Sequence, residues 1–221
     1  MKHHQILVAV VLFLISLLGL AGCEDPDAAE KDAIMDSLRQ LDQANIDCDG
    51  AAAVAVMSSE GIADYTRLVN LALDGTRVEV LGLEPSELMQ VLQLRNRLTR
   101  AQLEQMDGAA YQEYATSECW YISDDIEDVG YEWSVDDIKV YGDLAHAAIL
   151  DEDGKDSGLV VEFAKEDGVW KVNEFCFHRL YDEWLYSYAG QEGMEMADLL
   201  IAVEELEWGN PIRRSIWEPM R

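Results

Sequence analysis

The clearest indication of the fold comes from residues 140–175, VYGDLAHAAILDEDGKDSGLVVEFAKEDGVWKVNEF. The β-branched, aromatic and small apolar residues of this stretch fall into short runs, and Gly- and Asp-containing turns separate these runs. Tight turns between consecutive strands are typical of an antiparallel meander. With YEWSVDDIKV just before it, the stretch predicts four strands, at residues 131–140, 144–150, 158–163 and 168–177.

The chain before this sheet has helical periodicity. Ile34, Leu38 and Leu41 recur with the spacing of one helix face, and the residues from Asp47 to Gly50 end that helix. Three more helices are expected: one from Ser58 or Ser59 to Gly75, one from about Pro85, and one opened by the capping-box pair Thr99 and Gln102 and running toward Tyr111 and Tyr114. A last amphipathic helix is expected at about 192–207. The predicted class is α+β, with N-terminal helices packed on a curved antiparallel sheet.

The turns of this sheet resemble those of a known superfamily. The matching residues are Gly142, Asp143 and Ala145, then Lys165, Glu166, Asp167, Gly168, Trp170, Lys171 and Val172. They are similar to the C-terminal sheet of nuclear transport factor two-like proteins, the cone fold shared with ketosteroid isomerases and polyketide cyclases. The resemblance implies a cone-like domain over residues 30–178 with a pocket, and a C-terminal helical extension over 179–221. No position matches the Tyr and Asp pair of the isomerases, so their activity is not carried over.

A cone fold implies that alternate residues of the last strand line its pocket. Trp170, Val172, Glu174 and His178 share one parity on that strand, and Trp133 is a further pocket-lining candidate. If the tryptophan face points inward, Glu174 and His178 are the candidate catalytic groups, because a carboxyl group in an apolar cavity has a raised pKa and can act as a general base. The favoured interpretation is that Glu174 is an exposed strand-end carboxylate, His178 bonds locally and Trp170 is buried.

The N-terminus is typical of a secretory signal, with a short basic start and an apolar run over residues 6–20. The LAGC sequence that closes this run resembles the lipobox of bacterial lipoproteins, in which the signal is cut before the cysteine and the thiol is acylated. The resemblance implies a cleaved signal at 1–22, a lipid on Cys23, an acidic spacer at 23–29, and a mature protein in the cell envelope, facing the periplasm or the exterior. An ordinary cleaved signal or a retained anchor is the alternative.

The charge of the chain restricts its partners. There are 44 acidic residues against 16 Lys and Arg, a formal net charge of −28. Such a surface repels nucleic-acid phosphates and anionic lipid head groups, so nucleic acid is not an expected partner. The charge belongs either to a solvated acidic surface or to a surface that binds cations or a basic partner.

Three cysteines remain after cleavage: Cys48, Cys119 and Cys176. An odd number allows at most one internal disulfide in an oxidising compartment. Cys119 with Cys176 is the expected pair, and three buried reduced thiols are the alternative. The cysteine spacings match no zinc signature, and the acidic loop at 151–158 lacks the residue order of an EF-hand. No metal and no cofactor are expected.

The sequence therefore predicts a membrane-anchored, extracytoplasmic binding or assembly module, with a small apolar ligand or a protein as its partner. The alternative is a cone-fold enzyme, an isomerase, dehydratase or hydrolase, that uses Glu174 or another pocket carboxylate. A basic cluster, Arg95, Arg97 and Arg100, is expected to pair with nearby carboxylates, and an anion site is the alternative reading of that cluster.

Overall fold

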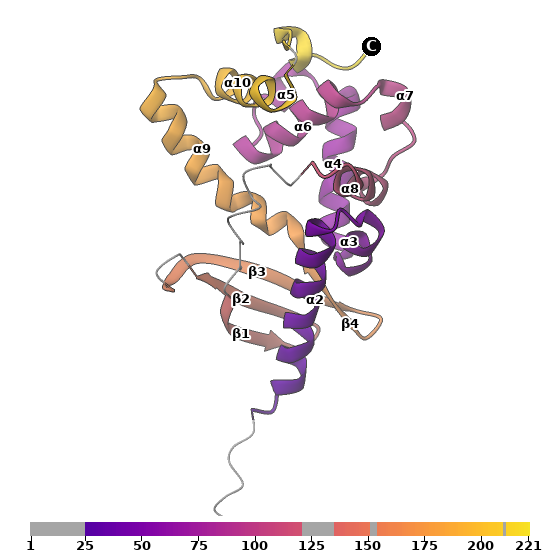
Figure 1. The fold of residues 1–221 in the computed structure, drawn as a ribbon, viewed down its shortest axis with the longest axis vertical. Coiled ribbons are helices and arrows are strands. Elements are labelled where there is room, and N and C mark those ends of the chain that lie inside the picture. The colour runs from indigo at the N-terminus through magenta and orange to yellow at the C-terminus, as the bar shows by residue number, and fades with distance from the viewer. Residues whose placement is uncertain (1–24, 121–134, 151–153, 210) are drawn as a thin grey trace, which may run out of the picture.

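The structure is a computed structural model that describes residues 25–120, 135–150, 154–209 and 211–221 (Figure 1). The predicted signal peptide, Cys23 and Trp133 lie outside the described residues. The described helices are α2 Ala28–Ile46, α3 Gly50–Val56, α4 Ser59–Asp74, α5 Arg77–Val80, α6 Pro85–Arg97, α7 Arg100–Leu103, α8 Gly108–Ser117, α9 His178–Glu192 and α10 Met196–Trp208. The strands are β1 Val135–Tyr141, β2 Leu144–Leu150, β3 Asp156–Glu166 and β4 Val169–Asn173, and two short 3-10 helices are η2 Glu174–Phe177 and η3 Arg214–Trp217.

The four strands form one antiparallel sheet in the order β1-β2-β3-β4, so the predicted meander is confirmed. Asp167 and Gly168 make the tight turn between β3 and β4, and both have positive φ, 51° and 81°. A two-residue turn with this geometry matches the twist of the paired strands and favours glycine at its second position. β4 ends at Asn173, so the strand predicted over 168–177 is wrong beyond that residue. The chain turns there into η2 and then α9.

One face of the sheet is buried, and α2 lies against it (Figure 1). The buried side chains on this face include Ala147, Val161, Phe163, Trp170 and Val172. The helix contributes the predicted face of Ile34, Leu38 and Leu41, and the Ser37 hydroxyl donates to the backbone carbonyl of Trp170 at 2.8 Å. The predicted α+β class and the predicted burial of Trp170 are confirmed.

Local capping chemistry explains where most of the N-terminal helices begin. Ser58 caps α4 by accepting from the Gly61 N–H, and Pro85 opens α6. The Thr99 and Gln102 capping box is present, but it opens only the four-residue α7. Asp107 then caps a separate helix, α8. The single fourth helix predicted through this region is therefore wrong, because a second N-cap residue interrupts it.

The C-terminal helices α9 and α10 pack against α6 and extend the same hydrophobic core. Their buried residues include Leu185, Ala189, Leu199 and Leu200. In Figure 1, α9 runs from the sheet toward the upper end of the molecule, where α10 lies beside α6. Among the residues that the structure describes, no helix has the length and apolar character needed to cross a membrane.

The basic cluster has structural partners. Arg97 pairs with Glu204 of α10 at 2.6 Å, and both side chains are buried. Arg100 pairs with Asp74 and Glu104, as predicted. Arg95 differs: its guanidinium donates to the backbone carbonyls that end α4, those of Leu71, Ala72 and Gly75. A buried guanidinium that satisfies helix-end carbonyls fixes α6 against α4.

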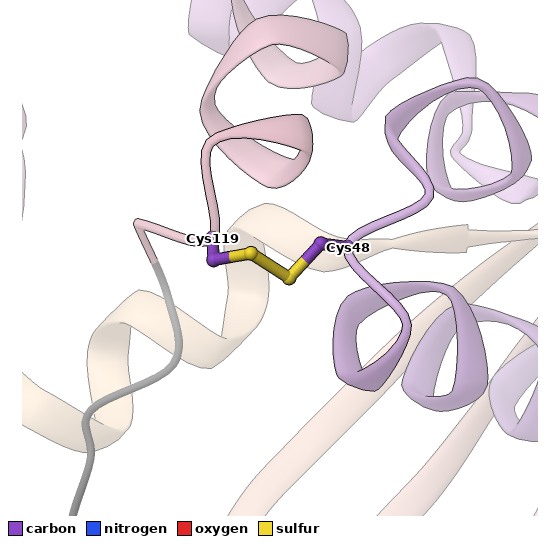
Figure 2. Close-up of a disulfide and its surroundings, with 2 residues drawn as sticks. All are labelled: Cys48 and Cys119. Carbon is purple, nitrogen blue, oxygen red and sulfur yellow. A yellow bond between two sulfur atoms is a disulfide. The ribbon is translucent and has the colours of Figure 1, made fainter.

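The disulfide joins Cys48 to Cys119 across 71 residues of sequence, so the expected pair Cys119 with Cys176 is wrong (Figure 2). Cys48 lies between α2 and α3, and Cys119 follows the end of α8. Cys176 is buried in η2 and is not part of this disulfide. Cys176 does not reach Cys119 because β4 ends at Asn173, and the turn that follows carries Cys176 into the core.

We expect the disulfide to stabilise the fold by about 2 to 4 kcal/mol, because closing a loop of this length restricts the unfolded chain. Urea unfolding with and without a reductant that opens the disulfide measures this effect. The double variant Cys48→Ser with Cys119→Ser is the control, and its stability should not respond to the reductant. A wild-type stability that is unchanged by reduction would contradict the assigned pair.

Candidate functional site

Glu174 and His178 come together with residues of two N-terminal helices. Glu174 is the first residue of η2, and its carboxyl group accepts a hydrogen bond from the Asn45 amide of α2 at 3.4 Å. His178 is the first residue of α9, and a 2.8 Å hydrogen bond joins its Nε2 to the Tyr65 hydroxyl of α4. The structure thus places both sequence candidates in one cluster, but through a turn and a helix start rather than through strand alternation.

The surroundings of this cluster are aromatic. The Tyr65 ring meets Phe175 and Tyr111 edge to face, with centroids 5.3 and 5.9 Å apart. Phe175 packs in the same way against His178, at 5.0 Å. Tyr65 and Tyr111 are fully buried, and Glu174 and His178 are partly buried. Polar groups in such a setting are poorly solvated, which disfavours their charged forms.

The pKa values of the cluster follow this burial. Burial raises the pKa of Glu174 to about 7, although hydrogen bonds from Asn45 and Tyr65 oppose the rise. Burial also raises the pKa of Asp42, which lies on α2, to about 6, and lowers the pKa of His178 to about 4. The expectation that Glu174 is an exposed strand-end carboxylate is therefore wrong. At neutral pH the Glu174 carboxyl group is partly protonated and partly ionised, and His178 is neutral.

A carboxyl group with a pKa near 7 can give or take a proton, but a catalyst also needs room for a substrate. One cleft, of about 510 Å³, lies along α4 and is lined by residues such as Thr66, Asn70 and Asp74. No residue of the Glu174 cluster lines it. Trp170 and Val172, the other sequence candidates, are packed in the core and do not line it either. Within the described part of the chain, no group of three or more His, Cys, Asp or Glu gathers as a metal site.

The raised pKa of Glu174 makes stability depend on pH. A carboxyl group whose pKa rises from 4.5 to about 7 on folding binds its proton more tightly in the folded state, so stability falls as pH rises through this window. Glutamine does not ionise, so Glu174→Gln should not lose stability in this way as the pH rises. We expect the variant to gain up to about 3 kcal/mol relative to wild type between pH 4.5 and 8.

Urea unfolding of both proteins across this pH range measures the effect. His178 and Asp42 are present in both proteins, so their own titrations largely cancel in the difference. Glu113→Gln changes an exposed glutamate and should differ from wild type by less than about 0.5 kcal/mol at every pH. A difference between Glu174→Gln and wild type that stays flat with pH would show that Glu174 is well solvated in the folded protein.

A second candidate site lies on α9, which the sequence predicted only as part of a helical extension. The inward face of α9 carries Leu185 and Ala189. Its outward side exposes Trp184, Tyr186 and Tyr188, at 56%, 55% and 39% of their surface. Trp184 and Tyr188, four residues apart, lie on the same side of the helix, and we call this pair the aromatic face of α9. Trp184 and Tyr188 stack one helical turn apart, with ring centroids 5.5 Å apart and an interplanar angle of 10°.

Exposed aromatic residues of this kind are enriched where proteins bind one another, because each buries a large area and loses little conformational freedom. Apolar residues are also exposed on the outer face of the sheet, among them Tyr141, Leu144 and Val160. Scattered exposed aliphatic residues are common on monomeric proteins, whereas a stacked Trp and Tyr pair is not. The signal in the sequence was the pair Trp184 and Tyr188 at i and i+4 beside acidic residues.

Comparison with known proteins gives no counterpart for this chain: no family model, no curated protein and no solved structure matches it. The resemblance to nuclear transport factor two-like proteins and the lipobox therefore stay predictions.

Proposed function

We propose that this protein is a lipid-anchored, extracytoplasmic binding module that engages a protein partner through the aromatic face of α9. The observation that carries the proposal is the exposed, stacked pair Trp184 and Tyr188. Tryptophan and tyrosine dominate the energetics of protein interfaces, and leaving them in water has no structural benefit to the monomer.

The disulfide supports an address outside the cytoplasm. Disulfides such as that between Cys48 and Cys119 persist in oxidising compartments and are rare where thiols are kept reduced. The sequence LAGC at residues 20–23 supports export by the lipoprotein route. One lipid-modified cysteine with two or more acyl chains is enough to hold a protein stably on a bilayer.

The direction in which α2 runs supports an accessible binding face. α2 begins at Ala28, five residues after Cys23, and its N-terminal end lies at the sheet end of the molecule (Figure 1). Five extended residues reach at most about 18 Å, so an anchor on Cys23 keeps the sheet end near the membrane. α9 runs away from that end. Trp184 and Tyr188 are exposed, so the aromatic face is accessible to a partner in the aqueous compartment.

We expect the mature N-terminus to be an acylated Cys23, because the cysteine closes the apolar run of the signal. Mass spectrometry of the purified protein measures this directly. Cys23→Ala should leave an uncleaved precursor. Detection of Met1, or of an unmodified cysteine at the mature N-terminus, would remove the lipid anchor from the proposal.

A photo-crosslinking residue placed at position 184 tests the binding face in intact cells. We expect one discrete crosslinked protein from position 184, and its loss when Tyr188→Ser is added. The matched control is the same crosslinker at Tyr141, which is equally exposed on the outer face of the sheet. Equal crosslinking from both positions, or none from position 184, would contradict the proposal.

The second candidate function is a cone-fold enzyme that uses Glu174 as its general acid or base. One observation favours it: the carboxyl group has a pKa of about 7 and lies within a Tyr65 and His178 hydrogen-bonded cluster. Glu174→Gln separates the two functions. The variant should crosslink from position 184 like the wild type if the protein is a binding module, and a cellular defect without loss of crosslinking would favour the enzyme.

A further inference from the structure

The surroundings of the aromatic face of α9 are strongly acidic. Between Leu180 and Ile212 the chain has eight acidic residues and no lysine or arginine. Glu183 and Glu192 lie on α9, Glu195 lies just before α10, and all three are exposed. Glu192 is one helical turn beyond Tyr188, so a carboxylate continues the stacked row.

We infer that the occupant of this face is an arginine-containing, basic segment of a partner protein. This inference rests on the proposed function and names the chemistry of its partner. A guanidinium stacks on aromatic rings and donates two parallel hydrogen bonds to a carboxylate, so a surface that combines both groups selects arginine over other side chains.

The same combination already holds an arginine inside this protein. The Arg97 guanidinium lies 4.8 Å from the centre of the Trp120 ring and donates to both oxygens of Glu204, at 2.8 and 2.6 Å. On α9 the aromatic rings and the carboxylates are present at the surface, and the arginine is supplied from outside.

The charge of the chain disfavours the other occupants of an aromatic face. A second copy of this chain brings another −28, so its acidic helix is repelled. Anionic lipid head groups and nucleic acid are repelled for the same reason. A cationic polypeptide gains attraction at long range and a stacked, ion-paired contact at short range.

Binding of short fluorescent peptides to the purified mature protein tests the inference by anisotropy at low and high salt. The probes are an alternating Arg-Ser peptide, its Lys and Glu counterparts, and zwitterionic vesicles. We expect the arginine peptide to bind several-fold tighter than the lysine peptide, and binding to weaken with salt. The pair Trp184→Ser with Tyr188→Ser should weaken binding at least about tenfold.

A charge-matched comparison separates a local site from the overall acidity. Glu183→Gln, Glu192→Gln and Glu195→Gln together remove three carboxylates from the α9 surface and should weaken binding at least about fivefold. Asp47→Asn, Glu113→Gln and Glu118→Gln together remove three exposed carboxylates elsewhere and should change binding less than about twofold. Equal weakening by the two sets, unchanged binding of the aromatic variant, or binding of vesicles that depends on Trp184 would overturn the inference.

The outcomes also separate this inference from the proposed function. If the peptides show no dependence on Trp184 while crosslinking from position 184 persists in cells, the partner is not basic but the binding face stands. If crosslinking is also absent, the binding face itself is wrong.

Discussion

Glu204→Ala is expected to lower the free energy of unfolding by about 3 to 5 kcal/mol. Glu204 is fully buried in α10 and accepts hydrogen bonds from Arg97 at 2.8 and 2.6 Å and from Asn96 at 2.9 Å. Removing it takes from the Arg97 guanidinium, whose side chain is 3% exposed, the buried carboxylate that accepts two of its hydrogen bonds. Breaking one partner of a buried ion pair is strongly destabilising for this reason.

Urea unfolding of three variants tests whether the broken Arg97–Glu204 ion pair causes the loss of stability. Glu192→Ala removes an exposed helical glutamate and should cost less than about 0.5 kcal/mol. The double variant Arg97→Met with Glu204→Leu removes both charges and should lie much closer to wild type than Glu204→Ala. A double variant as unstable as the single one would show that lost packing, and not the broken ion pair, causes the loss of stability.

Trp170→Ala is expected to cost about 3 to 5 kcal/mol, as deletion of a large core aromatic does. Trp170 is 2% exposed, and its indole N–H donates to the Glu30 carboxylate of α2 at 2.5 Å. Lys165 bonds the same carboxylate at 2.8 Å, so the indole completes a contact between α2 and the sheet. The variant loses core packing and the hydrogen bond together.

Two further tryptophan variants separate these contributions. Trp170→Phe keeps most of the ring volume and loses the N–H, so it should cost less than Trp170→Ala. Trp184→Ala removes an exposed ring and should cost less than about 0.5 kcal/mol. A loss below about 1 kcal/mol for Trp170→Ala would contradict the packing of α2 on the sheet.

Local chemistry made much of the fold predictable. Ser58, Pro85 and the Thr99 and Gln102 pair mark helix starts because capping is decided within one turn of chain. The meander was predictable because Asp167 and Gly168 require a tight turn. The burial of Trp170 followed from its alternation with Val172 in β4.

The end of β4 was not predictable. No glycine or proline follows Asn173 to mark a turn, and the next four residues, EFCF, are apolar enough to continue a strand. The contact that fixes this turn, between Tyr65 and His178, joins residues 113 apart in sequence. The disulfide was not predictable either, because the sequence spacing of three cysteines does not determine which two of them pair. Each of these features depends on tertiary contacts.

The candidate site was predictable only in part. Glu174 and His178 were identified and do lie together, but the environment of Glu174 was misjudged, because it lies in the turn after β4, hydrogen-bonded to Asn45 and Tyr65, and not at an exposed strand end. The aromatic face of α9 was missed because aromatic residues on an amphipathic helix normally point inward. In α9 the inward positions belong to the smaller Leu185 and Ala189.

Oxidative footprinting of the protein in intact cells, compared with the purified mature protein, tests whether a partner covers the aromatic face of α9 in the envelope. We predict that oxidation of Trp184 and Tyr188 falls several-fold in cells while that of Tyr141 is unchanged. Equal oxidation of Trp184 in both settings, or protection of Tyr141 in its place, would contradict the account.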